Sequence, residues 1–225
     1  MIFDVYCESI AGHKPKKYTE KNQDSCAYGK NKKYCCLCLA DGAGSKKYSS
    51  LGANCLVHDV CDYLMDNAAM LLEEDSAKIR SQAVLYIRDS LKKTAEQQNV
   101  NYSELSSTLM CFLTDGRKYL TIHLGDGVIL AERDGCLNVL SFPMNGDSKR
   151  STALTTMMNF EHHLRVCKET CELISIVWMM TDGAMYEVFQ ENYGLGGEKL
   201  SVPMIRGKLL SANDDATYGY IKWRK

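Results

Sequence analysis

The sequence contains only three prolines among its 225 residues, and no stretch is rich enough in Pro, Gly or Ser to serve as a linker. Internal repeats and low-complexity segments are missing as well. A chain of this length without a linker is expected to fold as one domain spanning residues 1–225. Because 45% of the residues are hydrophobic and 24% are charged, the chain can form a packed core, which excludes intrinsic disorder.

A surplus of one charge sign is also lacking. The formal net charge is -1 and residues of both signs are interspersed, so we expect no nucleic-acid partner and no acidic membrane surface as a partner. The one local excess is the basic stretch of Lys14, Lys16 and Lys17. It is interpreted either as a solvated loop or as a grip on an anionic substrate.

Long hydrophobic runs are absent too. The most apolar stretch, Leu173 to Met180, is too short to span a bilayer. The segment from Met1 to Val5 lacks the basic region and apolar core of a secretory signal, and Asp4 interrupts it. We therefore expect a soluble protein with a cytoplasmic location.

Cysteine is abundant, but the eleven residues are an odd number and several occupy apolar positions of predicted strands. Reduced thiols are therefore favoured over a disulfide framework. Cys35 and Cys38 form a C-x-x-C, yet no second pair and no suitably spaced histidines accompany them. Buried thiols are the favoured interpretation, and a zinc or redox site is the alternative.

Hydrophobic periodicity divides the chain into runs of strands and helices. Strands are predicted at 2–9, 25–29 and 34–40, then at 108–114, 119–124, 128–133 and 137–141 as one antiparallel meander, and finally at 163–168, 172–181 and 216–223. Helices are predicted over 49–72, along a stripe from Ile79 to Leu91 that follows an N-cap at Asp75, directly after Asp182, and around 197–211. Strands and helices grouped in this way indicate an α+β layered domain.

Three aspartates stand at the ends of predicted core strands. Asp41 and Asp182 each follow a strongly apolar strand, and Asp214 precedes one. Each position taken alone is explained by an ordinary turn, because Asp is common in turns of β-rich proteins. The ends of core strands are nevertheless rigid positions on which to mount a site.

The order of six short motifs is more specific than any one of them. Read along the chain from about residue 8 to its end, they resemble the PP2C family of protein phosphatases. The motifs are Asn22-Gln-Asp24, Leu39-Ala-Asp41-Gly-Ala-Gly44, Ser107-Thr-Leu, Leu124-Gly-Asp126-Gly, Met180-Thr-Asp182-Gly and Asn213-Asp214-Asp-Ala-Thr217.

Two further stretches are most similar to the compact bacterial branch of the family. They are Glu8-Ser-Ile-Ala-Gly-His13 and the phrase from Asn145-Gly-Asp to Ala153-Leu-Thr-Thr156. The resemblance implies an α+β fold of two stacked antiparallel sheets flanked by pairs of helices.

The resemblance also implies a metal site made of oxygen ligands. Hard divalent cations such as Mg²⁺ or Mn²⁺ are commonly bound through a few carboxylates. By resemblance, Asp41 would bridge two ions and Asp182 and Asp214 would bind the first of them. The Gly42 carbonyl would bind the second ion, and Asp24 would hold it directly or through water.

Two ions on the order of 4 Å apart can share a water, lower its pKa and aim the resulting hydroxide at phosphorus. The implied activity is thus Mg²⁺- or Mn²⁺-dependent hydrolysis of phosphoSer and phosphoThr, with Asp41 and Asp182 as the central residues and no covalent phosphoenzyme. The absence of a Cys-x5-Arg loop agrees with this, so the cysteines are expected to be spectators. For Asp126 the resemblance implies a third, weaker ion beside Asp182, and the alternative is a plain turn between two strands.

Three departures from the family pattern affect the substrate side of the site. Relatives usually carry Glu where this chain has Gln23, many carry Arg where it has Thr19, and some carry His where it has Ala43. These departures predict a lower metal affinity and leave the phosphate clamp and the proton donor to other residues. His13 is the candidate donor, with an ordinary surface histidine as its alternative. The candidate clamp residues are Lys16, Lys17 and Lys21.

Two other functions compete with an active phosphatase. A domain that keeps the fold but acts as a regulatory binding module, a pseudophosphatase, is suggested by the three departures. An unrelated β-rich domain with coincidental Asp-Gly turns is the other alternative. For the phosphatase, the resemblance implies a phosphoprotein substrate and a Ser/Thr kinase as partner.

Overall fold

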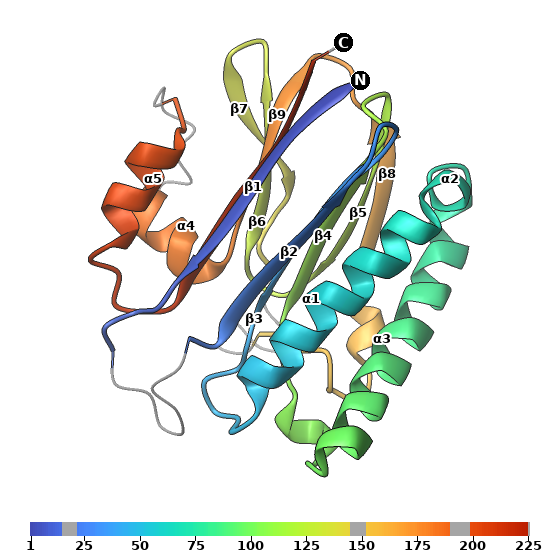
Figure 1. The fold of residues 1–225 in the computed structure, drawn as a ribbon, viewed down its shortest axis with the longest axis vertical. Coiled ribbons are helices and arrows are strands. Elements are labelled where there is room, and N and C mark those ends of the chain that lie inside the picture. The colour runs from blue at the N-terminus through green and yellow to red at the C-terminus, as the bar shows by residue number, and fades with distance from the viewer. Residues whose placement is uncertain (15–21, 145–151, 190–198, 225) are drawn as a thin grey trace.

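The computed structural model describes residues 1–14, 22–144, 152–189 and 199–224. In these residues two five-stranded antiparallel sheets stack face to face, with helices on both outer faces (Figure 1). The first sheet has the strand order β1 (Ile2–Ile10), β10 (Ala216–Arg224), β9 (Ile174–Met180), β6 (Val128–Arg133) and β7 (Cys136–Ser141). The second has the order β2 (Asp24–Lys30), β3 (Cys35–Asp41), β4 (Leu109–Thr114), β5 (Lys118–Leu124) and β8 (Arg165–Thr170). The predicted α+β sandwich is confirmed.

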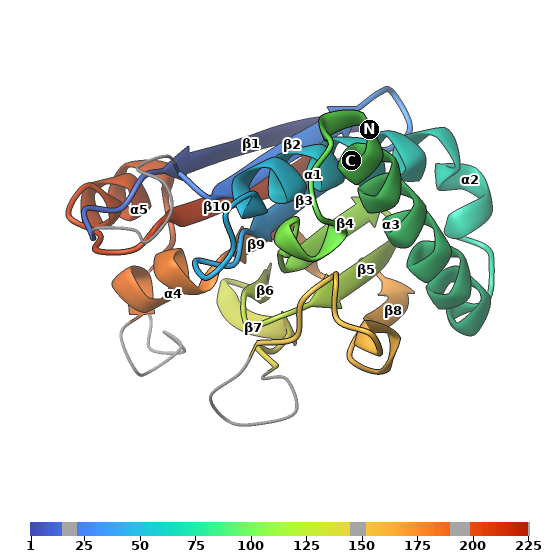
Figure 2. The same ribbon diagram turned by 90° about the horizontal axis from the view of Figure 1, so that it is seen from below.

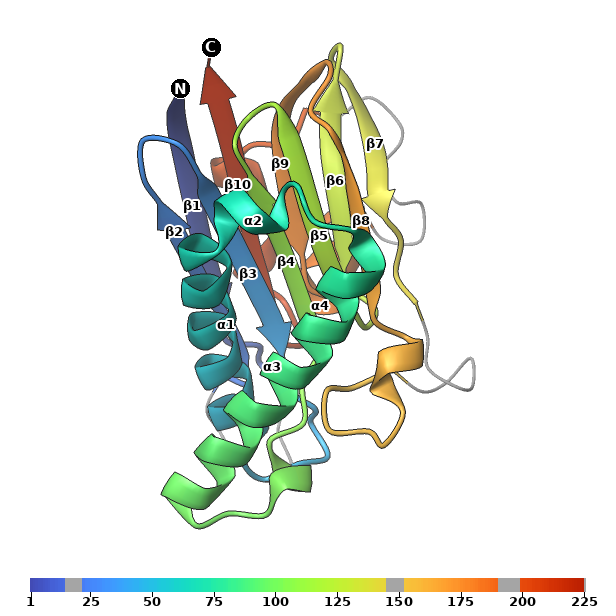
Figure 3. The ribbon, with the colours of Figure 1, turned by 90° about the vertical axis from the view of Figure 1, so that its right-hand side faces the viewer.

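Two long helices cover the outer face of the second sheet. They are α1 (Ser49–Asp66) and α3 (Ser76–Gln98), joined through the short α2 (Ala68–Leu71), and they lie side by side over the strands (Figure 3). The helix predicted over 49–72 is thus interrupted at Asn67. The predicted N-cap is present, because the Asp75 carboxylate accepts hydrogen bonds from the backbone N–H groups of Ala77 and Lys78.

The outer face of the first sheet is covered by α4 (Asp182–Phe189) and α5 (Val202–Leu209) (Figure 2). Three apolar layers result: one between the sheets, one under α1 and α3, and one under α4 and α5. In the described ranges, none of the helices has the length and apolar character needed to cross a membrane.

Strand β3 lies in the middle of this arrangement and is buried on both faces. Because successive side chains of a strand point to opposite faces, Cys35, Leu37 and Leu39 pack between the sheets while Cys36 and Cys38 pack under α1. The two thiols of the C-x-x-C therefore lie in different layers, which rules out a site shared by this pair. All eleven cysteines fall in the described ranges and are free thiols, as predicted.

The prediction of a single meander over the four strands from 108 to 141 is wrong. β4 and β5 pair with each other in the second sheet, whereas β6 and β7 pair in the first. The chain changes sheets at Gly125-Asp126-Gly127, where Gly125 has φ +113, a conformation that L side chains rarely adopt. Apolar alternation predicts strands, but it does not specify which sheet a strand joins.

Candidate metal-binding active site

The five predicted aspartates come from separate elements that meet at one end of the sandwich. Asp24 begins β2 and Asp41 ends β3, and these two residues are paired across the strands. Asp126 lies in the crossover between β5 and β6, Asp182 opens α4, and Asp214 precedes β10. This end is opposite to the one that holds both chain termini (Figure 1).

Three of the carboxylates form a tight cluster. Each of Asp41, Asp126 and Asp182 offers one oxygen such that all three oxygens lie within 4.8 Å of one another. Oxygens bound to one octahedral Mg²⁺ at 2.0–2.1 Å lie about 3 to 4 Å apart, so small rotations of these side chains would let them share ions. Asp214 lines the same pocket as Asp182.

Burial and mutual repulsion raise the pKa values of the inner carboxyls. Burial raises the pKa of Asp24 to about 7. Burial, reinforced by the charges of Asp24 and Asp182, raises the pKa of Asp41 well above its usual range. Burial and then the charge of Asp126 raise the pKa of Asp182 to about 6. Such a group of carboxyls must either hold protons or bind a cation, so its chemistry fits a divalent ion.

Asp24 has one satisfied and one unsatisfied oxygen. Its Oδ2 accepts a hydrogen bond from Thr181 Oγ1 at 2.8 Å, and Thr181 Oγ1 in turn accepts from Thr217 N at 2.9 Å. Its Oδ1 is buried and has no hydrogen-bond partner among the described residues. Leaving a buried acceptor unsatisfied is costly, and an ion or a water on an ion would satisfy it.

The backbone at Gly42 is held close to β2. Gly42 N donates to the Gln23 carbonyl at 3.1 Å, and a Cβ at position 42 would lie only 2.6 Å from that oxygen. Glycine is therefore required here for the close approach of two backbones. Binding of an ion by the Gly42 carbonyl stays a prediction.

Gln23, which stands where relatives carry Glu, has a structural role. It is 4% exposed, and its Nε2 donates to Ser49 Oγ at 2.6 Å. This bond connects the start of β2 to the first residue of α1, next to the metal site. The side-chain amide thus stabilises the frame of the site without adding a charge to it.

Asp215 is a positioning residue that was not predicted from the sequence. It is buried, with Oδ1 accepting from Gly12 N at 2.9 Å and Oδ2 accepting from Gln23 N at 2.7 Å. The carboxylate thereby fixes the backbone on both sides of residues 15–21 relative to the start of β10. No local pattern in the sequence indicates this role, because both partners lie far from Asp215 along the chain.

Of the residues predicted to bind the substrate or to donate a proton, the structure describes only His13. Lys16, Lys17 and Lys21 lie outside the described residues, as does Thr19. His13 is described: its Nε2 lies 3.1 Å from the Leu210 carbonyl, at the C-terminal end of α5. Its role as proton donor stays a prediction.

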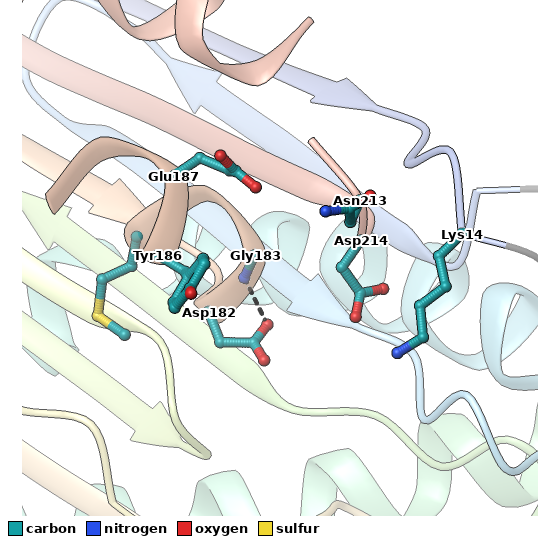
Figure 4. A pocket seen from close by; sticks show the side chains of 8 residues that line it. Lys14, Asp182, Gly183, Tyr186, Glu187, Asn213 and Asp214 are labelled. Carbon is teal, nitrogen blue, oxygen red and sulfur yellow. Dashed lines mark hydrogen bonds between the residues drawn. The ribbon is translucent and has the colours of Figure 1, made fainter. Parts of the chain in front are cut away.

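Lys14 is the cation that the structure does place beside the carboxylates. Its side chain extends toward Asp214 along one wall of a pocket of about 320 Å³, which Asp182 and Tyr186 also line (Figure 4). At the N-terminus of α4, Asp182 Oδ1 accepts a hydrogen bond from Gly183 N at 2.7 Å. The pocket therefore joins the carboxylate cluster to the surface and contains both charge signs.

A two-sheet sandwich with aspartates at its strand ends is an architecture suited to a hard-metal hydrolase. Residues 11–206 match the model of the family described as Protein phosphatase 2C. The chain belongs to the protein phosphatase 2C family. Among curated proteins, no significant match exists.

Several solved structures share the fold. A bacterial serine phosphatase has a TM-score of 0.71 at 12% identity, covering 99% of this chain and 98% of that one. The serine/threonine phosphatase Stp1 from Staphylococcus aureus has a TM-score of 0.70 at 12% identity, covering 100% and 96%. The catalytic domain of PstP, in complex with 2 manganese ions, has a TM-score of 0.65 at 17% identity, covering 98% and 97%.

Proposed function

We propose that this protein is a Mg²⁺- or Mn²⁺-dependent protein phosphatase that hydrolyses phosphoserine and phosphothreonine residues of proteins. The observation that carries the proposal is the cluster of Asp41, Asp126 and Asp182 oxygens within 4.8 Å. Family membership supports it, as does similarity to structures named as serine/threonine phosphatases, one of them solved with two manganese ions.

The carboxylates would divide the ions between them as the family pattern implies. Asp41 would contact two ions, with Asp182 and Asp214 on one side and Asp24 and the Gly42 carbonyl on the other. Asp126 would support a third, weaker ion next to Asp182, to which its oxygen is close. When bound, the ions would lower the pKa of water and offset the charge of the phosphoryl oxygens, which permits direct hydrolysis.

The side chains around the site would position the ions and the phosphoryl group and would contact the peptide substrate. Asp41 and Asp182 are mounted on the ends of buried strands, so their carboxylates are held in place by the core. Lys14 would hold a phosphoryl oxygen as a point charge at the pocket, replacing the missing arginine fork. Tyr186 is 64% exposed on the wall of the same pocket and offers an apolar face to a peptide.

The test is hydrolysis of a phosphothreonine peptide by the purified chain in Mn²⁺. Activity should disappear in EDTA and return when Mn²⁺ is restored. Asp41→Asn should remove it, because the amide cannot supply the charge that two ions share. Asp134→Asn is the matched control, since Asp134 lies in an exposed Asp-Gly turn and its positive φ of 50 suits Asn.

Calorimetry separates the active enzyme from the alternative. A folded chain that binds no Mn²⁺ at millimolar concentration and cleaves no peptide would favour the regulatory binding module, consistent with the uncharged Gln23 and Ala43. A kinase partner and a cytoplasmic location stay predictions, because they depend on the family resemblance and the composition alone.

A further inference from the structure

Four cysteine thiols collect in the layer under α1, away from the carboxylate site. Cys36 and Cys38 lie two residues apart on β3 and point to the same face. Cys61 reaches the same place from α1, and Cys111 on β4 is the cross-strand partner of Cys38. None of the four side chains is more than 3% exposed.

The sulfur atoms lie closer together than the backbone positions require. The Sγ atoms of Cys36 and Cys38 are 3.7 Å apart, and together with Cys61 Sγ all three lie within 4.8 Å of one another. Residues two apart on a strand are separated by about 6.5 Å along it, so these side chains turn toward each other. Two thiolates on one tetrahedral zinc, each about 2.3 Å from it, lie about 3.8 Å apart. The pair therefore already has the spacing of two ligands of one ion.

The three sulfurs belong to a cluster of buried apolar side chains. Hydrogen bonds from Cys36 and Cys38 lower the pKa of Cys61, while burial raises the pKa of both Cys36 and Cys38. A Cβ built on Gly29 would lie 3.4 Å from Cys61 Sγ and 3.3 Å from Met65 Sδ, so a thioether borders the cluster as well. Thiolate and thioether ligands select Zn²⁺ and Cu⁺ over the hard ions that suit the aspartates.

We propose that Cys36, Cys38 and Cys61 form a binding site for a thiophilic d¹⁰ ion, Zn²⁺ or Cu⁺. Cys111, beside Cys38, is the available fourth sulfur. Binding exchanges thiol protons for the ion and leaves the oxidation state of sulfur unchanged. The ion would connect α1 to β3, the strand that ends at Asp41, so its expected effect is on the stability of the layer under α1.

Co²⁺ is a suitable probe because only thiolate ligands give it intense sulfur-to-metal charge-transfer absorption, which the aspartate site cannot produce. The reduced, metal-free chain is incubated with Co²⁺, and in parallel it is refolded from denaturant with Co²⁺ because the thiols are buried. We expect the absorption to saturate at one ion per chain, to be displaced by Zn²⁺, and to accompany a rise in Tm. In a parallel experiment the chain is loaded with Cu⁺, and its retention of Cu⁺ against a competing chelator is measured. Comparison with the displacement of Co²⁺ by Zn²⁺ shows which of the two ions the site prefers.

Cys61→Ser should abolish the absorption, and Cys171→Ser, a buried cysteine in the layer between the sheets, should retain it. The proposal is overturned if the wild type shows no charge-transfer absorption in either preparation and retains no Cu⁺. It is also overturned if Cys61→Ser absorbs like the wild type. Should Cys61→Ser fail to fold, X-ray absorption of the zinc-loaded wild type decides: sulfur neighbours at about 2.3 Å support the site, and only lighter neighbours overturn it.

Discussion

Strand β3 takes part in two clusters of like side chains that differ in chemistry and in surroundings. Its last residue, Asp41, belongs to an oxygen cluster next to a pocket at the end of the sandwich. Its middle residues, Cys36 and Cys38, belong to a sulfur cluster enclosed under α1. Hard oxygen ligands suit Mg²⁺ and Mn²⁺, whereas soft sulfur ligands suit Zn²⁺ and Cu⁺. One strand thus presents two kinds of site because its end and its middle meet different neighbours.

The difference shows how strongly each cluster depends on a ligand. Neutral thiols pack in a core as small hydrophobic groups, so the sulfur cluster is stable with or without an ion. Carboxylates at similar separations repel one another once they ionise, and burial strengthens that repulsion. The oxygen cluster therefore requires protons or cations in the folded state, whereas the sulfur cluster requires neither.

The largest expected effect is that of Asp182→Asn on catalysis. Removing one charge from the cluster weakens the binding of the ions. Because the ions stabilise the transition state by several kcal/mol, kcat/KM should fall by about 10³-fold or more. The measurement is steady-state hydrolysis of a phosphothreonine peptide at saturating Mn²⁺. A fall of less than about tenfold would mean that the oxygen cluster is not the catalytic centre.

Asp215→Ala tests whether the backbone around the oxygen cluster must be held in place by a residue that is not itself a ligand. The substitution leaves the buried N–H group of Gln23 and the half-buried N–H group of Gly12 without their charged acceptor. This loss should cost about 2 to 4 kcal/mol in the free energy of unfolding. Urea denaturation of the metal-free chain measures this cost. Asp4→Ala on the exposed edge of β1 is the control, and equal stability of the two variants would contradict the positioning role.

Much of this frame was predictable because the signals were local. Asp41, Asp182 and Asp214 were predicted from adjacent apolar runs and the order of short motifs. In the structure Asp41 ends β3, Asp182 opens α4 and Asp214 lies just before β10. Element bounds followed from the same periodicity, since alternation and the helical repeat each report on a few neighbouring residues.

Contacts across long sequence separations were not predictable. Asp215 bonds to Gly12, 203 positions away, and nothing near either residue encodes that pairing. Cys61 joins Cys36 and Cys38 only because α1 packs on the second sheet. The change of sheet at Gly125 was missed for the same reason, since strand partners are chosen by the packing of the whole domain.

The stability of the metal-free chain should fall as the pH rises. The folded-state pKa values of Asp24 and Asp182 are raised to about 7 and about 6, so the folded chain binds more protons than the unfolded chain between about pH 4 and pH 7. Stability contributed by this difference is present at low pH and is lost as the pH rises through the folded pKa values. From pH 5 to pH 8 we expect a loss on the order of 4 kcal/mol, the larger part of it from Asp24.

Urea unfolding in EDTA at the two pH values measures this loss. Asp24→Asn should reduce it, because the amide does not ionise and can still accept a hydrogen bond from Thr181. Mn²⁺ should stabilise the wild type more at pH 8 than at pH 5. A metal-free chain that grows more stable from pH 5 to pH 8 would show that the carboxyls of the oxygen cluster do not hold protons in the folded state.

The smallest expected effect is that of Lys14→Ala, which tests whether the oxygen cluster has a cationic partner for the phosphoryl group. A point charge at an open pocket contributes about 1 kcal/mol, so KM for the phosphopeptide should rise about fivefold while kcat changes little. Lys14→Arg should restore most of the affinity, because the positive charge is kept. Lys92→Ala, an exposed lysine on α3, is the matched control. The difference between Lys14→Ala and the wild type should shrink in high salt, since counterions screen an exposed charge. A KM unchanged at low salt would show that Lys14 does not hold the phosphate.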